Sequence, residues 1–257
     1  MPVEHDTVLG FDFLSASPEE AAEAVVARAS STENRPVVVS TINAQFAVLA
    51  REQEDFRRAI QASTFRVPDG MSLVWAGRIT GHPLKSRITG REMFVHLVRA
   101  AAERGWSVFL LGDTDEVLRQ TVERLHTVFP ALRISGTISP PFPFFLNGPE
   151  SERIVAEIRR SKSDVVFVAL GAPKQEVWIA KTAMRLDTKL VMGVGGAFRM
   201  FAGLMPVAPD FWQRLGLEWF WRLIHEPKRL LARYTIGNAK FAWLVLKEMS
   251  RSIREKR

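Results

Sequence analysis

The stretch DVVFVALGAPKQEVWIAKTAMRL, residues 164–186, decides the fold class of this 257-residue chain. It opens with an apolar run in which polar residues do not alternate with apolar ones, and such a run predicts a strand covered on both faces. A helical pattern follows after a short turn that contains Gly171. A buried strand followed directly by a helix is the repeating unit of parallel α/β folds.

The same unit recurs along the first 200 residues. Apolar runs predict further strands at residues 37–41, 64–68, 107–112, 132–139 and 190–195, and helical patterns lie between them at 43–63, 71–80, 90–105 and 113–129. This rhythm predicts a Rossmann-like, mostly parallel sheet with helices on both faces. We therefore assign residues 1–204 to one Rossmann-like domain.

Residues 205–257 have a different composition. They show no strand pattern, and they carry eleven Lys and Arg against five Asp and Glu, so most of the net charge of +7 lies here. Four of the seven tryptophans lie here too. Basic residues interleaved with tryptophan predict a helical appendage that binds an anionic, partly apolar surface, which fits a membrane better than nucleic acid.

The sequence contains neither a signal-peptide pattern nor a membrane span. The start, MPVEHDTVLG, carries acids and lacks a basic segment followed by an apolar one. No apolar run reaches the roughly 18 residues that a spanning helix needs. The chain has no cysteine, which excludes disulfides and thiolate metal sites. We expect a cytoplasmic protein that is peripheral to a membrane.

Asp69 is the first candidate for a functional side chain. In VPDGMSLVWAG (67–77) it stands between a predicted strand and a predicted helix. As a helix cap, a carboxylate here accepts a backbone hydrogen bond and contributes about 1 kcal/mol. At a strand end beside Leu73 and Trp75 it is also suited to act as a general base, because burial raises the pKa of a carboxyl group. The two interpretations are compatible.

Other strand ends also carry polar residues or glycines, and parallel sheets bind ligands at these ends. Thr41 and Asn43 in STINAQF (40–46) offer a hydroxyl and an amide, although a turn with a helix cap explains the asparagine equally well. Gly112 and Gly195 are the last residues of two further predicted strands, and we include both as candidate donor-binding residues.

ALGAPKQE (169–176) is a sharper signal for an anion. Gly171 lets the backbone approach a ligand closely, and the N-terminus of the following helix attracts negative charge. Lys174 adds a cation and Gln175 adds hydrogen-bonding groups. The segment suits a diphosphate, with an ordinary strand–helix turn as the alternative.

Several ligand motifs are absent or weak. GVGGAF (193–198) is not G-x-G-x-x-G, so a dehydrogenase is poorly supported. Asp113 and Asp115 form the D-x-D pattern by which many nucleotide-sugar enzymes hold a divalent metal, but capping at a helix start explains them more simply. The histidines are scattered and suggest no zinc site. We expect no metal or other cofactor, with Mg²⁺ as the alternative.

In the appendage, Arg222, Arg229 and Arg233 are spaced by seven and four residues, which places them on one face if a single helix continues through Pro227. Such a face is either a solvated basic surface or a set of guanidinium groups that bind phosphate.

STINAQF, VPDGMSLV, the G-R-E at 90–92, GAPKQE, GVGGAF and GLEWFWRLIHEPKRLLARY occur in this order. Together they resemble the WecG/TagA/CpsF glycosyltransferase family over about residues 10–235. The resemblance implies an inverting, metal-independent enzyme on the inner face of the cell membrane. Such an enzyme moves a sugar from a UDP-sugar to a polyprenyl-diphosphate-linked saccharide in wall, capsular or exopolysaccharide assembly.

The resemblance also implies roles for single residues. Asp69 matches the family's proposed base, and Thr41 and Asn43 match polar residues beside it. Gln175 matches a glutamine near the donor. In the appendage, Arg222 and Arg229 match arginines thought to contact the lipid diphosphate.

The chain departs from the family pattern at Arg199, where many members have an acid, and at Ala232–Arg233, where many have two arginines. A uronic acid donor is one rationale for the cation at Arg199. The alternative function is a nucleotide-binding regulatory module docked to membrane, which would bind UDP without turnover. The sequence leaves the sugar, the acceptor saccharide, the linkage and the oligomeric state open, and an exposed apolar tail favours self-association away from membrane.

Overall fold

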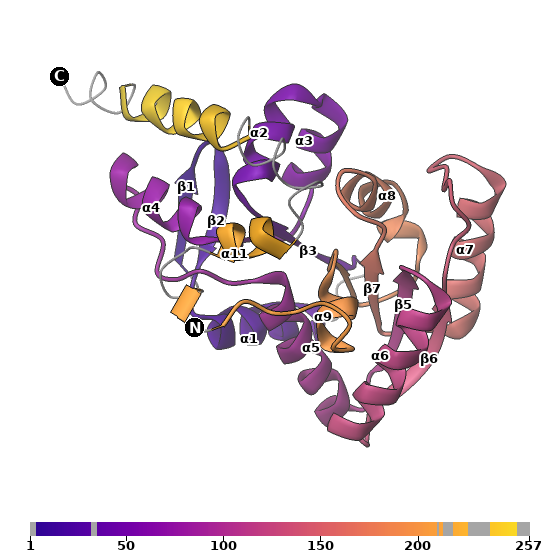
Figure 1. Ribbon diagram of the computed structural model, residues 1–257. Helices are drawn as coiled ribbons and strands as arrows, with labels where there is room; N and C mark the ends of the chain where they lie inside the picture. Colours follow the sequence, from indigo (N-terminus) through magenta and orange to yellow (C-terminus); the bar gives the residue numbers. More distant parts are fainter. Residues whose placement is uncertain (1–3, 32–34, 210, 213–217, 226–236, 251–257) are drawn as a thin grey trace.

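The computed structural model describes residues 4–31, 35–209, 211–212, 218–225 and 237–250. At its centre is a six-stranded sheet in the order β4-β3-β8-β7-β5-β6, in which every neighbouring pair is parallel (Figure 1). The strands are β3 (Val37–Ile42), β4 (Phe65–Pro68), β5 (Ser107–Gly112), β6 (Arg133–Ile138), β7 (Val165–Ala169) and β8 (Leu190–Gly193). The predicted α/β fold and its six strands are confirmed.

The central strands are apolar along their whole length because helices cover both faces of the sheet. Successive residues of β5 and β7 point to opposite faces, so Leu110 and Phe167 join one core cluster while Leu111 and Val168 join another. All four side chains are fully buried. This double burial explains why a run without polar alternation predicted these strands correctly.

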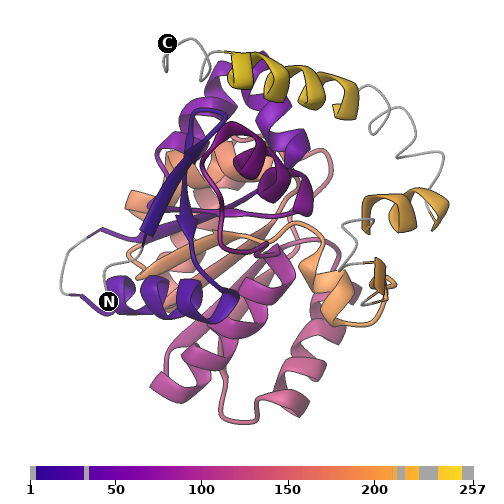
Figure 2. The ribbon, with the colours of Figure 1, turned by 90° about the vertical axis from the view of Figure 1, so that its left-hand side faces the viewer.

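Two layers of helices enclose the sheet, one above and one below it in Figure 2. The first layer contains α1 (Pro18–Ala29), α5 (Gly90–Arg104), α6 (Asp115–Val128) and the short α9 (Ala197–Phe201). The second contains α7 (Pro149–Ser161) and α8 (Lys174–Thr182), which runs into the 3-10 turn η1 (Ala183–Arg185). The two predicted helices at 90–105 and 174–186 belong to opposite layers.

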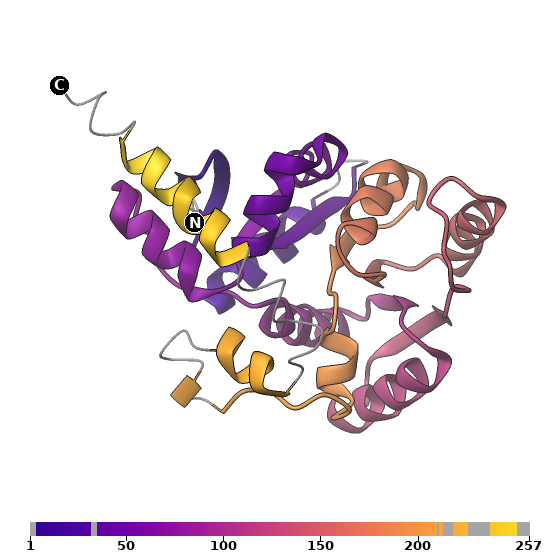
Figure 3. The same cartoon turned by 45° about the horizontal axis from the view of Figure 1, so that its top comes forward.

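A third apolar cluster lies beside the β3–β4 edge. It is built by the antiparallel hairpin β1 (Glu4–Val8) and β2 (Phe11–Ser15), by α2 (Ala44–Glu52) and α3 (Glu54–Gln61), and by α4 (Met71–Thr80). A helix at residues 237–250, here called the C-terminal helix, joins the cluster through Phe241 and Val245, each 8% exposed. Figure 3 shows this helix beside α4.

The appendage is described only in part. It contains α11 (Glu218–His225) and the C-terminal helix. In the described ranges, no helix is both long and apolar enough to cross a membrane. The division at residues 204 and 205 and the binding of the appendage to membrane stay predictions.

Replacing Gly112 by alanine is expected to destabilise the fold by about 3 kcal/mol. Gly112 ends β5 with φ +109°, and a Cβ atom there would lie 2.4 Å from the carbonyl oxygen of Ala169 on β7. The variant therefore adds backbone strain to a backbone clash at the centre of the sheet. Urea denaturation of both proteins measures the difference.

Gly105→Ala is the matched control. Gly105 also has a positive φ, +64°, but a Cβ atom there meets nothing within 4 Å. This variant should cost about 1 kcal/mol, because only the backbone conformation opposes it. Equal costs at the two positions would contradict the role of the clash.

Candidate active site

A cavity of about 1000 Å³ opens at the carboxyl ends of β3, β4, β7 and β8. Parallel sheets gather ligand-binding groups at these ends, because each strand leaves the sheet there and enters a loop. The polar and charged side chains that line the cavity include Thr41, Asn43, Asp69, Arg87, Thr89, Arg91, Asp113, Gln175 and Arg199. The cavity thus brings together most of the site residues predicted from the sequence.

Asp69 lies half-buried on the cavity wall, directly after β4. Its backbone N–H donates to the carbonyl of Ile42 at 2.6 Å, which fixes it beside the end of β3. Gly70, rather than Asp69, occupies the N-cap position of α4. Trp75 also lines the cavity, whereas Leu73 is fully buried in the third cluster. Asp69 therefore lines the cavity at the ends of β3 and β4.

Thr41 and Asn43 line the cavity beside Asp69 and come from the end of β3. Asn43 caps α2, because its side-chain oxygen accepts the backbone N–H of Phe46 at 3.1 Å. The cap leaves the amide nitrogen for other partners. Thr41 lies against the start of α5, where a Cβ atom on Gly90 would be 3.3 Å from its hydroxyl oxygen.

Two arginines on the cavity wall were given no role by sequence reasoning. Arg87 lies in the loop before α5, 14% exposed, with Nη2 3.5 Å from Oε1 of Glu92. Arg91 lies in the first turn of α5. The loop is tied to β4, because Ile88 donates its backbone N–H to the carbonyl of Pro68 at 2.9 Å. These guanidinium groups bring positive charge to the side of the cavity that holds Asp69.

Gln175 is almost fully buried, 3% exposed, and connects two loops of the site. Its Oε1 accepts the backbone N–H of Gly195 at 3.0 Å, and its Nε2 donates to Oε1 of Glu176 at 2.7 Å. The amide also fits against Gly193, where a Cβ atom would lie 2.3 Å from Nε2. Gln175 therefore holds the GVGG turn against α8 and shapes the cavity floor.

Glu176, the next residue, was not predicted as a site residue. It is 5% exposed, and burial raises its pKa to about 7, against the opposing effect of hydrogen bonds from its own backbone and from Gln175. Its Oε2 atom has no hydrogen-bond partner. A carboxyl group without full hydrogen bonding is costly to ionise in the interior.

Of the five remaining donor-site predictions, the four other than Arg199 divide into two kinds. Gly171 and Gly195 line the cavity, both with positive φ and with open space where a Cβ atom would be. Lys174 and Gly112 are not among its lining residues. The Lys174 ammonium points to the carbonyl of Phe144, at 3.5 Å, and Gly112 packs against Ala169. Their donor-binding roles stay predictions that this geometry does not support directly.

Arg199 lies on the cavity wall and forms a two-pronged ion pair with Asp113. Its Nε is 2.8 Å from Oδ2 and its Nη2 is 2.7 Å from Oδ1 of the aspartate, which is 7% exposed. Asp113 also accepts the backbone N–H of Thr114 at 2.9 Å. The first acid of the D-x-D pattern thus neutralises Arg199, and Asp115 begins α6 as an exposed residue.

The three predicted diphosphate-binding arginines are not placed. Arg222 belongs to α11, but its side chain lies outside the described part of the chain. Arg229 and Arg233 lie outside the described residues altogether. Their contact with an acceptor diphosphate stays a prediction.

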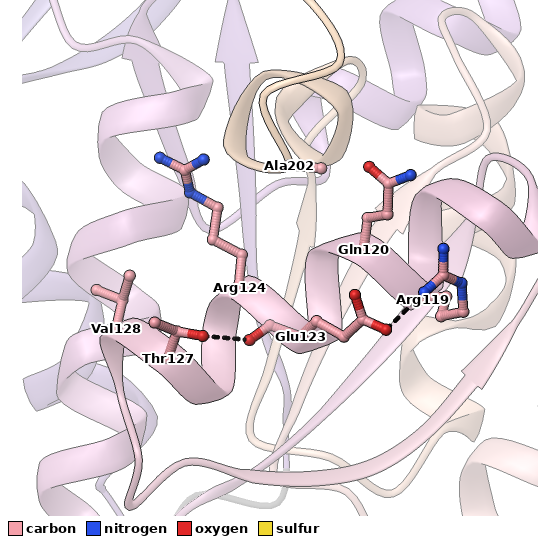
Figure 4. A pocket seen from close by; sticks show the side chains of 7 residues that line it. All are labelled: Arg119, Gln120, Glu123, Arg124, Thr127, Val128 and Ala202. Carbon is pink, nitrogen blue, oxygen red and sulfur yellow. Dashed lines mark hydrogen bonds and ion pairs between the residues drawn. The ribbon is translucent and has the colours of Figure 1, made fainter.

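A second hollow, of about 570 Å³, lies on the surface of α6 (Figure 4). Its lining comes from one helix and Ala202, and it is dominated by long polar side chains. Arg119 pairs with Glu123 at 2.6 Å, and Thr127 donates to the carbonyl of Glu123. Because exposed i,i+4 pairs of this kind are ordinary features of a solvated helix, we place the candidate active site in the larger cavity.

The chain is similar to known proteins over most of its length. The pattern of the Glycosyl transferase WecG/TagA/CpsF family matches residues 7–255. An N-acetylglucosaminyldiphosphoundecaprenol N-acetyl-beta-D-mannosaminyltransferase of Bacillus subtilis (strain 168) is 34% identical over 213 residues, covering 82% of this chain and 79% of the relative. The protein of the same name from Bacillus spizizenii (strain ATCC 23059 / NRRL B-14472 / W23) is 31% identical over 217 residues, covering 84% and 80%.

The match spans both the sheet and the appendage, and it confirms the resemblance stated from the sequence motifs. Both relatives are named as glycosyltransferases. We conclude that this chain is a glycosyltransferase and belongs to the WecG/TagA/CpsF family.

Proposed function

We propose that this enzyme moves a sugar from a UDP-sugar, with inversion, to a polyprenyl-diphosphate-linked saccharide during the assembly of a cell-surface polysaccharide. The relatives' names suggest N-acetylglucosaminyl-diphosphoundecaprenol as the first acceptor to test and N-acetylmannosamine as the first sugar. The observation that carries the proposal is the half-buried carboxylate of Asp69, which shares one cavity with Thr41, Asn43 and several arginines.

In this mechanism Asp69 acts as the general base. It takes the proton from an acceptor hydroxyl while the hydroxyl oxygen attacks the anomeric carbon from the face opposite UDP. The bond between that carbon and the diphosphate oxygen breaks, and its electron pair leaves with UDP. A single displacement with one base inverts the configuration and needs no covalent enzyme intermediate.

The charge that develops on the leaving diphosphate needs donors placed in advance. Arg87 and Arg91 are the cavity cations next to the end of β4, and we assign them this role. The N–H of Gly195 is already donated to Gln175, so we assign Gly195 to shaping the cavity rather than to binding the diphosphate directly. Thr41 and Asn43 would orient the acceptor hydroxyl beside Asp69.

The appendage completes the proposal. Its excess of basic residues and its tryptophans suit the anionic headgroups of the inner membrane face, where a lipid-linked acceptor is presented. We propose no resident cofactor. The described residues contain no cluster of three or more His, Asp or Glu side chains suited to a metal ion. Because Mg²⁺ is the alternative, the assay is run both without and with added Mg²⁺.

A screen of UDP-sugars for UDP release tests the proposal, with a short-chain polyprenyl-diphosphate N-acetylglucosamine as acceptor. We expect one UDP-sugar to support UDP release that requires the acceptor, and the product to carry the inverted anomer. The alternative, a regulatory nucleotide-binding module, predicts UDP binding without turnover. Absence of acceptor-dependent release with every donor and with added Mg²⁺ would overturn the proposal.

A further inference from the structure

The cavity has two chemically different ends. At the sheet, its lining is polar and charged, with Asp69, Arg87 and Arg91. Away from the sheet, it is lined by apolar side chains of two helices, Trp75 and Ile79 of α4 with Phe241, Ala242, Val245 and Leu246 of the C-terminal helix. Figure 3 shows these two helices side by side. We call the space between them the apolar groove.

Along each of the two helices, the residues that line the cavity change from polar at the N-terminal end to apolar toward the C-terminal end. On α4, Ser72 lines the cavity near Asp69, and Trp75 and Ile79 follow one and two turns later. On the C-terminal helix, Asn238 comes first and is hydrogen-bonded to Gln45 at 3.3 Å. The groove thus begins at the polar end and leads away from it for about 12 Å, the length of eight helical residues.

The floor of the groove is fixed, while its walls remain exposed. Phe241 and Val245 are each 8% exposed and pack in the third cluster, which anchors the C-terminal helix. An ion pair between Lys240 and Glu52 adds to this attachment. In contrast, Ile79 and Leu246 are 55% and 57% exposed. Large apolar side chains left exposed along a cavity mark a binding surface for an apolar ligand.

We propose that the apolar groove binds the first isoprenoid units of the lipid acceptor. The inference rests on the proposed function, which supplies an acceptor with a diphosphate joined to an isoprenoid chain. Only an occupant with a charged head and an apolar tail matches a groove that is continuous with a cationic, polar cavity. With four chain bonds of about 1.5 Å per unit, the groove has room for about two or three units.

This placement predicts that the protein itself, and not only the membrane, selects the carrier chain. A buried CH₂ group strengthens binding by about fourfold, so each partly buried isoprenoid unit should lower the dissociation constant by about tenfold. Units added after the groove is filled should not lower the dissociation constant further. Inorganic diphosphate, which lacks a chain, should bind only at the polar end.

The experiment is a calorimetric titration of the full-length protein, without membranes, with inorganic diphosphate and with prenyl diphosphates of one to four isoprenoid units. Concentrations stay below those at which the ligands form micelles. We expect the dissociation constant to fall by about tenfold per unit and to level off at two or three units. Equal affinity for all chain lengths would overturn the inference.

Ile79→Asp and Leu246→Asp test the groove from its two opposite walls. Both side chains are exposed, so we expect the variants to fold, which circular dichroism verifies. Each should remove most of the chain-length dependence while changing the affinity for inorganic diphosphate by less than about twofold. Trp243→Asp is the control, because Trp243 is 59% exposed on the same helix but does not line the cavity. A loss of the dependence in the control as well would contradict a specific groove.

Binding and turnover separate the two proposals. Chain-length-dependent binding without transfer to any lipid-linked acceptor would refute the proposed function and leave the groove intact. Transfer with binding that is independent of chain length would refute the groove alone.

Discussion

Asp69→Asn is expected to lower the turnover number by about 10²- to 10⁴-fold, the usual contribution of a positioned general base. The amide has nearly the same shape as the carboxylate but cannot accept the proton of the acceptor hydroxyl. Affinity for UDP and the free energy of unfolding should change little, because Asp69 is half-buried and its backbone N–H still bonds to Ile42. Acceptor-dependent UDP release, UDP titration and thermal unfolding measure these quantities.

Asp55→Asn serves as the control for this variant. Asp55 lies exposed in the first turn of α3 and does not line the cavity. Its replacement should leave turnover within about twofold and stability within about 0.5 kcal/mol. If Asp69→Asn kept normal turnover, another group would have to take the proton, and the assignment of the base would be wrong.

Glu176→Gln is expected to raise the free energy of unfolding by about 3 kcal/mol at pH 8 and to leave it almost unchanged at pH 4. Burial raises the pKa of Glu176 from 4.5 to about 7, so the folded state holds its proton more tightly than the unfolded state. The contribution of Glu176 to the free energy of unfolding is therefore fully present below pH 4.5 and is lost as the pH rises to about 7. The neutral glutamine does not titrate and escapes this loss.

Urea denaturation at several pH values from 4 to 8 gives the free energy of unfolding of the native protein and of Glu176→Gln. The difference between the two proteins at each pH tests the prediction. Glu103→Gln, an exposed position on α5, is the control and should leave the pH dependence of stability as it is in the native protein. Parallel pH profiles for the native protein and Glu176→Gln would show that Glu176 ionises without cost. Because the glutamine can still accept from Gln175, the variant tests the charge rather than the hydrogen bond.

The parallel sheet could be predicted because burial on both faces leaves a strong apolar signal in each strand. Helix α4 was also predicted at its observed bounds, Met71–Thr80. The helix expected at 43–63 is instead two helices, α2 and α3, because Gln53 between them is extended, with φ −127° and ψ 107°. The hairpin of β1 and β2 was missed. Its first strand, EHDTV, is short, polar and mostly exposed, so it carries no periodic signal.

The candidate site residues that lie at the ends of strands could be predicted from the sequence. Asp69, Thr41 and Asn43 lie at the ends of adjacent strands, and the topology of a parallel sheet brings such residues together. The pairing of Arg199 with Asp113 links residues 86 apart and depends on side-chain directions that no local pattern encodes. Arg87 was missed for a similar reason, since its loop has no periodicity.

The two ends of the cavity come from separate pieces of the chain. Loops of the sheet build the polar end, and α4 with the C-terminal helix builds most of the apolar one. With the proposed roles of the two ends, substitutions at strand ends would change the sugar specificity and leave the carrier specificity as it is. Chimaeras that exchange only the last helix would then offer engineers a route to new carriers.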